Sequence, residues 1–500
     1  MDMQSGTAEV RSHEVVIVGA GFAGIGMAVG LHRHGFDDYV VLERGEDIGG
    51  TWRDNRYPGA ACDVPSHLYS FSFSPNPNWS RTFSPQQEIW EYQKKVVAEA
   101  GIRDKFLFGR ELLAARWDSD EQEWELRTSN GAFRARYFIA ATGTLSDPKL
   151  PAIPGIDDFS GKLMHSATWD AQVEFSGLRV GVIGTGASGV QIIPELAKTA
   201  GTLTVFQRSA PYVTPRHDRE YSAAEKRLFE RLPERLAEMR SEMFWQNEGR
   251  FVERQAIPAL LEESAKLALD HLATQVTDPE LRAKLTPDYQ IGCKRILKSQ
   301  DYYPALTQDN VTLETRVIDR MYGTTIRLAD GDTVELDVLV LATGFEAADL
   351  QVAHRISGRG GVVLGDQWQG GMQAYATTTV HNFPNFFILK GPNAGLGHNS
   401  ILYIIEAQID YVIGALEFAK QNRVVEIEVL AAAEEAYVEG LTARSRGTVW
   451  LEGGCHSWYV DARNGRLTTV WPDFAHLFRE ENAEFVPGPY RTISPEPVTP

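Results

Sequence analysis

Apolar residues in the N-terminal part of the chain follow a strand–turn–helix order. Residues 15–18 form a short β-branched run of the kind found in buried strands, and residues 25–34 predict a helix after a glycine turn. Residues 39–42 predict the next strand. The same order returns later, as residues 179–183, 187–200 and 203–206. The pattern therefore predicts two α/β units of the same type.

Each unit carries a glycine-rich turn between its first strand and its helix. The turns contain Gly19, Gly21 and Gly24 in the first unit and Gly184, Gly186, Ser188 and Gly189 in the second. Glycines at this spacing permit a tight turn, close approach of the backbone to a pyrophosphate, and close packing of helix on strand. The helix N-terminus adds free amides and a positive dipole. We therefore predict an α/β fold with two Rossmann-like dinucleotide-binding domains.

The residue that ends the second strand of each unit favours a different nucleotide. Glu43 ends the strand over residues 39–42, and a carboxylate there binds a ribose diol and repels a 2′-phosphate, which favours FAD or NAD. The corresponding strand of the second unit ends in Gln207-Arg208-Ser209. Arg208 can bind a 2′-phosphate, which favours NADPH over NADH, and an exposed strand-end charge is the alternative.

A loop rich in glycine and aromatic residues follows the first site. It begins with Gly50, Thr51 and Trp52 and reaches Asp63. We interpret it as a cover over a large planar ring. The alternatives are a surface loop around a buried tryptophan and, for Asp63 alone, a turn or cap residue.

Residues 225–288 are rich in Ala, Leu, Glu and Arg and predict a helical insertion into the second domain. Asp278-Pro279 is a typical helix start. Helical spacing is shown by Leu261, Ala265, Ala268 and Leu272. An apolar cluster is expected to pack there, with contact to a substrate as the alternative; it comprises Met239, Met243, Phe244 and Trp245.

Two later segments carry further candidate chemistry. Lys294-Arg295 follows the insertion and is either surface charge or a contact to a phosphorylated nucleotide. Residues 385–391 predict a strand, and residues 392–399 form a Gly/Asn turn before a long helix, which suits contacts to a flavin edge or a pyrophosphate. We expect His398, within this turn, to be a capping residue rather than a catalytic one.

Length, charge and cysteine content narrow the class of protein. Five hundred residues predict two or three domains, and a net charge of −18 argues against a general binder of nucleic acid or anionic membranes. The longest apolar run, residues 15–31, is interrupted by glycines and predicts no membrane span, and the N-terminus lacks an apolar signal region. No metal-ligand cluster is apparent.

The cysteines bear on redox chemistry and compartment. Cys62, Cys293 and Cys455 lie far apart, and the absence of Cys-x-x-Cys argues against a dithiol pair of the usual spacing and a zinc site. An odd number of cysteines favours a reducing compartment, and we expect the protein in the cytoplasm.

Two signatures resemble those of type I Baeyer–Villiger monooxygenases. The fingerprint F-x-G-x-x-x-H-x-x-x-W-[P/D] is matched by Phe159, Gly161, His165, Trp169 and Asp170. A second signature, around the cover loop, is matched by Gly50, Trp52, Tyr57, Pro58, Gly59 and Asp63. The resemblance runs from about Val15 to Phe478. The related N- and S-oxygenating flavin monooxygenases usually carry Phe or Tyr in place of Trp169.

The resemblance implies a reaction. NADPH at the second site would reduce FAD at the first, and O2 would add to the flavin as a C4a-peroxide. That peroxyflavin would attack a ketone, and the Criegee intermediate would rearrange to an ester or lactone. Sulfide oxidation is also expected. The implied partners are O2 and a small-molecule ketone or sulfide, with no nucleic acid.

The resemblance also assigns roles to single residues. Arg295 is similar to the family's catalytic arginine, and Asp63 to the acid that orients and supports it. Lys294 is similar to the NADP 2′-phosphate ligand beside Arg208, and Trp458 to the tryptophan that closes over NADP. His165 resembles a structural residue that couples the linker to the domains.

The implied domains alternate along the chain. We expect an FAD-binding domain over residues 1–147 and 384–500, an NADP-binding domain over 148–220 and 293–383, and the helical insertion over 221–292. Prolines at 148, 151 and 154 mark the linker. The residues after Glu484 are predicted to form a loose tail.

Departures from the family leave the substrate class open. Many ketone-oxidising relatives carry Pro where this chain has Ile296, and the loop over residues 391–400 also differs. The alternatives are a heteroatom (S or N) oxygenase of the same architecture and, with less support, a two-nucleotide reductase or a flavin-binding module without catalysis. The oligomeric state is left open.

Overall fold

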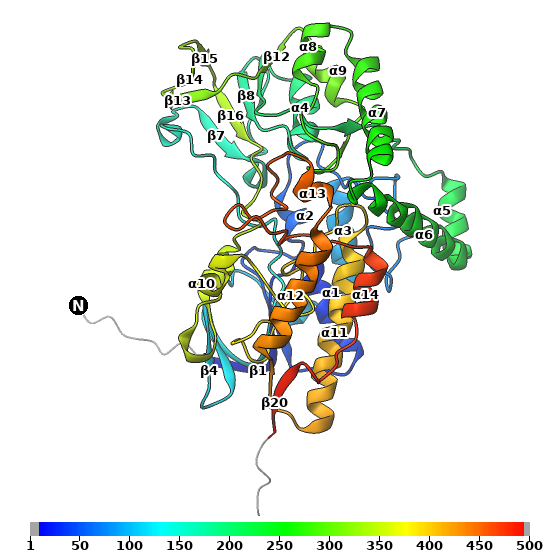
Figure 1. Cartoon of the computed structure of the whole chain (residues 1–500), viewed down its shortest axis with the longest axis vertical. Coiled ribbons are helices and arrows are strands. Elements are labelled where there is room, and N and C mark those ends of the chain that lie inside the picture. Colours follow the sequence, from blue (N-terminus) through cyan, green and yellow to red (C-terminus); the bar gives the residue numbers. More distant parts are fainter. Residues whose placement is uncertain (1–9, 495–500) are drawn as a thin grey trace, which may run out of the picture.

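The computed structural model describes residues 10–494 and contains two lobes, each built around its own sheet (Figure 1). In the first lobe, β1 (Val10–Val18) pairs in parallel with β2 (Tyr39–Leu42) and with β6 (Gly131–Ala140), and α1 (Phe22–Arg33) joins β1 to β2. The predicted first α/β unit is confirmed. β6 is one continuous strand that ends at Ala140, just before Ala141-Thr142-Gly143.

The first sheet has eight strands in the order β17-β4-β5-β6-β1-β2-β3, with β18 also paired to β6. Its remaining strands are β3 (Phe106–Leu107), β4 (Leu112–Asp118), β5 (Glu123–Thr128), β17 (Ile356–Ser357) and β18 (Phe386–Ile388). Side chains of β1 alternate between two cores: Val15 and Ile17 lie in one apolar cluster, Val16 and Val18 in the other. Helices α1, α3 (Gln86–Glu99) and α11 (Ile401–Asn422) contribute to the first cluster.

The second sheet has five strands in the order β12-β9-β8-β16-β7, all paired in parallel. Its strands are β7 (Lys162–His165), β8 (Arg179–Ile183), β9 (Thr202–Phe206), β12 (Val311–Glu314) and β16 (Val338–Leu341). After the second glycine turn comes α4 (Gly189–Ala197), and α9 (Tyr302–Leu306) packs against it. A small antiparallel sheet flanks this lobe, formed by β13 (Ile318–Tyr322), β14 (Thr325–Leu328) and β15 (Thr333–Glu335).

The segment between β9 and β12 contains most of the helices of the second lobe, in the region where a helical insertion was expected. It contains α5 (Ala223–Arg231), α6 (Pro233–Glu248), α7 (Pro258–Gln275) and α8 (Pro279–Lys284). The Asp278 carboxylate accepts hydrogen bonds from the backbone N–H groups of Glu280 and Leu281, so the predicted helix start is confirmed. Leu261, Ala268 and Leu272 form the buried face of α7.

The C-terminal part returns to the first lobe. Its elements are α10 (Leu364–Gln367), β19 (Glu426–Val429), α12 (Ala431–Ser445), α13 (Val449–Glu452), α14 (Ala475–Asn482) and β20 (Tyr490–Ile493). β20 pairs antiparallel with β19. The loose tail predicted after Glu484 is therefore wrong up to residue 493, and residues 495–500 lie outside the described part.

The return to the first lobe begins earlier than residue 384. β17 pairs with β4 of the first sheet, and Leu350, Leu364 and Trp368 belong to the apolar cluster on that sheet. We therefore propose a domain boundary near residue 345. A strand of two residues leaves no periodic signal in the sequence, which is why the pattern did not place it.

No helix within residues 10–494 is both long enough and apolar enough to cross a bilayer.

Candidate active site

A cavity of about 1630 Å³ lies between the two lobes and is lined by both glycine-rich turns. Each turn follows the carboxyl end of a central parallel strand, β1 in the first sheet and β8 in the second. Crevices at this end of parallel strands are the usual binding place for nucleotides in α/β folds.

The first turn has the shape that a dinucleotide requires. Gly19 has φ +108°, and a Cβ there would overlap the carbonyl oxygen of Ala141. A Cβ on Gly24 would overlap the carbonyl oxygen of Gly19. At Gly21 the nearest atom, Cα of Gly50, would lie 3.7 Å away, so the backbone is open on this side. The outer glycines serve packing, and the middle one leaves room for a phosphate.

The second turn repeats this geometry. Gly184 has φ +107°, and a Cβ there would overlap the carbonyl oxygen of Ala342. Gly189 packs in the same way on Gly184, whereas a Cβ on Gly186 would meet nothing within 4 Å. Ser188 also lines the cavity. The two turns therefore fit two nucleotides that face one cavity.

Glu43 lies at the first turn, as predicted. Its carboxylate is buried and accepts hydrogen bonds from the backbone N–H groups of Ala20 (2.8 Å) and Gly45 (2.7 Å). It also forms an ion pair with Arg53 at 2.8 Å. Glu43 thus anchors the turn; its contact with a ribose diol stays a prediction.

The predicted cover loop lies beside this turn. Gly50 precedes α2 (Thr51–Asp54) with φ +52°, and Thr51 and Trp52 line the cavity. The indole N–H of Trp52 donates to the Tyr69 hydroxyl at 3.0 Å. The loop is therefore part of the cavity wall.

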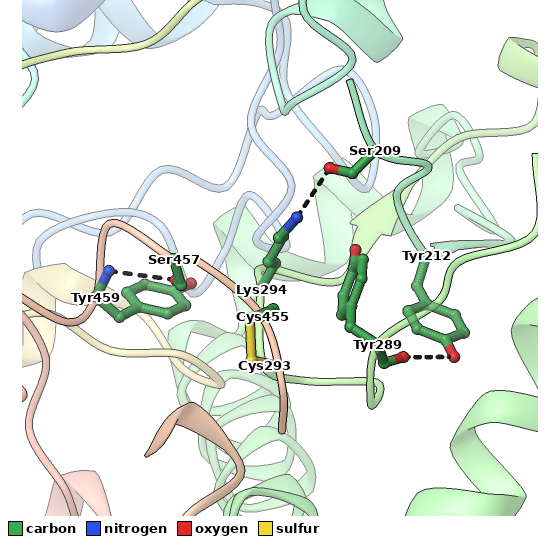
Figure 2. Close-up of a disulfide and its surroundings, with 8 residues drawn as sticks. All are labelled: Ser209, Tyr212, Tyr289, Cys293, Lys294, Cys455, Ser457 and Tyr459. Carbon is green, nitrogen blue, oxygen red and sulfur yellow. Dashed lines mark hydrogen bonds between the residues drawn. A yellow bond between two sulfur atoms is a disulfide. The ribbon is translucent and has the colours of Figure 1, made fainter. Parts of the chain in front are cut away.

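Two cations, Lys294 and Arg208, line the cavity beside the second glycine turn, and we call this pair the cationic corner. Figure 2 shows Lys294 of this pair. The Lys294 ammonium donates to Ser209 Oγ at 2.8 Å and lies over the ring of Tyr289. Burial, and then the nearby charge of Arg208, lower the pKa of Lys294. Within residues 10–494 neither cation has a carboxylate partner. Two unpaired cations beside a serine hydroxyl form a suitable site for a phosphate.

Arg295 and Asp63 join the two lobes across the cavity. The guanidinium donates through Nε to Asp63 Oδ2 at 2.8 Å and through Nη2 to Oδ1 at 2.7 Å. Burial acts to raise the pKa of the Asp63 carboxyl, but Arg295 outweighs it and holds that pKa below its usual value. The charge of Asp63 in turn raises the pKa of Arg295. The pair is therefore a fixed, fully ionised dipole on the cavity wall.

Sequence reasoning missed two other lysines near this pair, of which Lys390 lines the cavity. Lys390 follows β18, lines the cavity and donates to Thr144 Oγ1 at 2.7 Å. Burial, and then Arg295, lower its pKa to about 8. Lys298 donates to the carbonyl oxygen of Asp63 at 3.2 Å, and its pKa is lowered to about 8, mainly by burial. A lysine at the end of an apolar strand was the only signal for Lys390.

The Gly/Asn turn before α11 is held by a buried carboxylate of the insertion. Glu248, at the end of α6, accepts hydrogen bonds from Asn399 Nδ2 (2.8 Å) and His476 Nδ1 (2.9 Å) and pairs with His398 Nε2 (3.2 Å). The expectation that His398 is a capping residue is wrong, because Ser400 caps α11 and His398 is a buried partner of Glu248. The predicted packing cluster is confirmed in part: Phe244 packs on Tyr403 and Met239 on the first core, whereas Trp245 is 56% exposed. None of its members lines the cavity.

The family fingerprint lies away from the cavity. Residues 159–170 include the edge strand β7, and none of them lines the cavity. His165 is buried, its Nδ1 accepts the backbone N–H of Ala167, and its ring packs edge-on against Phe345. Trp169 packs on Phe175. This placement suits a structural role for His165 and no contact with substrate.

The loop that carries Trp458 also lines the cavity. Trp458 is 46% exposed, lines the cavity and packs on Tyr459 with ring centroids 4.4 Å apart. Cys293 and Cys455, 162 residues apart, form a disulfide behind this loop. Two of the three cysteines are therefore paired, and the inference of a reducing compartment from their odd number loses its basis. Cys62 is the one free thiol of the described chain, and burial raises its pKa to about 12.

Comparison with known proteins identifies the class of protein to which this site belongs. A family profile described as pyridine nucleotide-disulphide oxidoreductase matches residues 16–246. A Baeyer–Villiger monooxygenase of Streptomyces coelicolor is 43% identical over 498 residues, which span 98% of this chain and 95% of the relative. The structure of cyclohexanone monooxygenase from Rhodococcus sp. Phi1 bound to NADP+ superposes with a TM-score of 0.88 at 30% identity, over 97% of this chain and 100% of that one. A structure of OTEMO in complex with FAD and NADP superposes with a TM-score of 0.84 at 28% identity, over 97% and 100%.

Two nucleotide turns that face one cavity, with an arginine–carboxylate pair between them, define a flavin-dependent oxidoreductase that uses a pyridine nucleotide. Within that class, the chain belongs to the Baeyer–Villiger monooxygenases.

Proposed function

We propose that this chain is an FAD-containing, NADPH- and O2-dependent monooxygenase that converts ketones to esters or lactones. The observation that carries the proposal is the Arg295–Asp63 pair, which lies in the same cavity as both glycine turns. A reductase needs only the two nucleotides, whereas oxygenation of a carbonyl also needs fixed positive charge where an oxyanion develops.

The first turn would hold FAD. The open backbone at Gly21 would receive the pyrophosphate, Glu43 the ribose, and Trp52 the edge of the planar ring system. When bound and reduced, FAD supplies the activated oxygen for the reaction. The protein's contribution is to exclude water and to fix the charges around the substrate carbonyl.

The second turn would hold NADPH. Gly186 leaves room for its pyrophosphate, and Arg208, Ser209 and Lys294 would bind the 2′-phosphate. Trp458, which also lines the cavity, would cover the nucleotide. The pKa of Lys294 is lowered by burial and by Arg208, so a phosphate dianion would relieve a repulsion that the protein alone leaves in place.

Arg295 would act on the oxygenation step. Its guanidinium keeps donor capacity on the cavity side while Asp63 fixes its orientation through two hydrogen bonds. A charge held in this way stabilises an oxyanion at the former carbonyl oxygen without reorganisation during the reaction. Asp63 orients Arg295 rather than transferring a proton, because its pKa is held below the usual value.

A reductase that passes electrons to a protein disulfide is not supported. Neither Cys293 nor Cys455 is among the residues of the cavity wall, and Cys293 is fully buried. Thioether oxidation is compatible with the same site, and it requires no oxyanion stabilisation by Arg295.

The test is product analysis with cyclic and linear ketones and a thioether, each supplied with NADPH and O2. We expect an ester or lactone from at least one ketone, in proportion to the NADPH consumed, and a sulfoxide from the thioether. Sulfoxide without any ester would assign the chain to heteroatom oxygenation instead. Turnover of NADPH without O2 would support the reductase alternative.

A further inference from the structure

The Cys293–Cys455 disulfide joins two segments that line the same cavity. Cys293 directly precedes Lys294 and Arg295, whereas Cys455 lies two residues before Ser457 and three before Trp458. Figure 2 shows the bond between the Lys294 side chain and the loop that carries Ser457. The bond therefore connects the segment that carries Lys294 and Arg295 to the loop that carries Ser457 and Trp458.

Few other interactions hold this loop. The backbone N–H of Gln290 donates to the carbonyl oxygen of Gly453 at 3.0 Å, and Tyr459 is fixed through Thr468 and Thr469. Between these two anchors, no hydrogen bond in the described chain joins residues 454–458 to a segment outside the loop. The exposed Trp458 thus lies at the end of a stretch whose covalent attachment to the segment of Lys294 is the disulfide, and its ring packs on the anchored Tyr459.

Next to the disulfide, the backbone of Gly453 packs closely against Cys293. Cys293 is fully buried, and a Cβ on Gly453 would lie 2.7 Å from the Cys293 Cβ. A glycine is therefore needed where the loop passes Cys293. Because Gly453 has no side chain, the backbone can lie close enough to Cys293 for the disulfide to form. α13 (Val449–Glu452), which ends just before this glycine, then keeps its position.

We propose that the Cys293–Cys455 disulfide is a reducible tether that positions the Ser457–Trp458 loop over bound NADPH, an inference that rests on the proposed function. A dithiol reduces the bond by two electrons and two protons, which yields two cysteine thiols and the oxidised dithiol. Without the bond, residues 454–458 gain conformational freedom that nucleotide binding must then remove. The reduced enzyme holds NADP less tightly and loses it before oxygen transfer is complete.

The tether predicts a specific kinetic pattern. Trp458 and Ser457 belong to the mobile side, while Lys294 and Arg295 stay fixed by Ser209 and Asp63. Breaking the bond should therefore raise KM for NADPH and the Kd of NADP+ by about tenfold. The rate of flavin reduction at saturating NADPH should change little. The fraction of NADPH that ends in oxygenated product should fall, with hydrogen peroxide as the balance.

The experiment compares the FAD-loaded wild type before and after dithiothreitol with the variant Cys455→Ser treated in the same way. Thiol titration in denaturant should show one thiol per chain before reduction and three after it. The Kd of NADP+, read from the flavin absorbance, should rise on reduction of the wild type and match that of Cys455→Ser. The variant itself should not respond to dithiothreitol, which controls for other effects of the reductant.

An unchanged Kd and unchanged peroxide yield in the fully reduced wild type would overturn the tether, as would three free thiols in aerobically purified enzyme. If Cys455→Ser fails to fold, the reduced wild type still decides. The proposed function fails separately: absence of ester from every ketone would refute it, whereas the Kd comparison requires no product.

Discussion

At the level of single residues, several cations line the cavity, and some of them lack a carboxylate partner in the described chain. Arg295 is paired with Asp63, whereas Lys294, Lys390 and Arg208 have no carboxylate partner within residues 10–494. Unpaired, partly buried cations are costly unless an anionic ligand completes the site. The arrangement is that of a protein which binds phosphates and stabilises an oxyanion.

Arg208→Ala tests the phosphate assignment. The change should raise KM for NADPH by about 10- to 100-fold, since a hydrogen bond to a charged group contributes about 1.5–3 kcal/mol. KM for NADH should stay within about twofold, because NADH has no 2′-phosphate. Steady-state kinetics with both nucleotides makes the comparison, and Arg227→Ala, an exposed arginine on α5, is the matched control. Equal increases for NADPH and NADH would refute 2′-phosphate recognition.

The sequence could predict some of these residues because they occupy fixed positions in a repeated unit. Glu43 and Arg208 each end the strand that follows a glycine turn, and a strand-end residue at that place faces the nucleotide. Lys390 and Lys298 have no such position. Their role depends on which neighbours the fold brings together, such as Thr144 and Asp63, more than 200 residues away.

Among the helices and strands, the segments with a clear hydrophobic period could be predicted from the sequence. Short strands, and strands that form only by pairing with a distant segment, could not. β2 and β8 have the expected bounds, and α7 buries the face that its spacing indicated. β17 and β20 were missed, because a two-residue strand and a strand near the Pro-rich C-terminus show no alternation. Both are formed by pairing with distant strands rather than by local preference.

One element contains a buried carboxylate whose ionisation opposes folding. Glu434 of α12 accepts the backbone N–H of His381 at 2.6 Å, and burial raises its pKa to about 7 from 4.5. The folded state therefore binds a proton that the unfolded state releases between these values. Stability accordingly falls as pH rises from about 4.5 to 7, and stays lower above it.

Glu434→Gln should remove this loss. We expect the variant to unfold at a higher temperature than the wild type at pH 8, by an amount equivalent to about 1–3 kcal/mol, and to differ little from it at pH 5. Melting curves of the FAD-loaded proteins at both pH values give the measurement. A variant that is less stable at pH 8, or equally changed at both pH values, would show that ionised Glu434 does not oppose folding.

At the scale of the whole molecule, two lobes with separate nucleotide turns enclose one cavity, and long-range contacts complete it (Figure 1). Asp63 reaches Arg295 across 232 residues, and Cys293 reaches Cys455 across 162. The presence of two nucleotide sites follows from the sequence pattern. The packing of the two lobes places both nucleotide sites and Arg295 on one cavity. Without the family resemblance, the sequence did not predict this arrangement.

The two halves of the reaction use different parts of this cavity: the turns and Lys294 serve reduction, and Arg295 serves oxygenation. Arg295→Ala separates them, with flavin reduction by NADPH followed by rapid mixing without O2, and ester yield measured after O2 is admitted. We expect a reduction rate within about threefold of the wild type and an ester yield at least about 100-fold lower, with peroxide formed instead. An equal loss of both steps, or an unchanged ester yield, would contradict it.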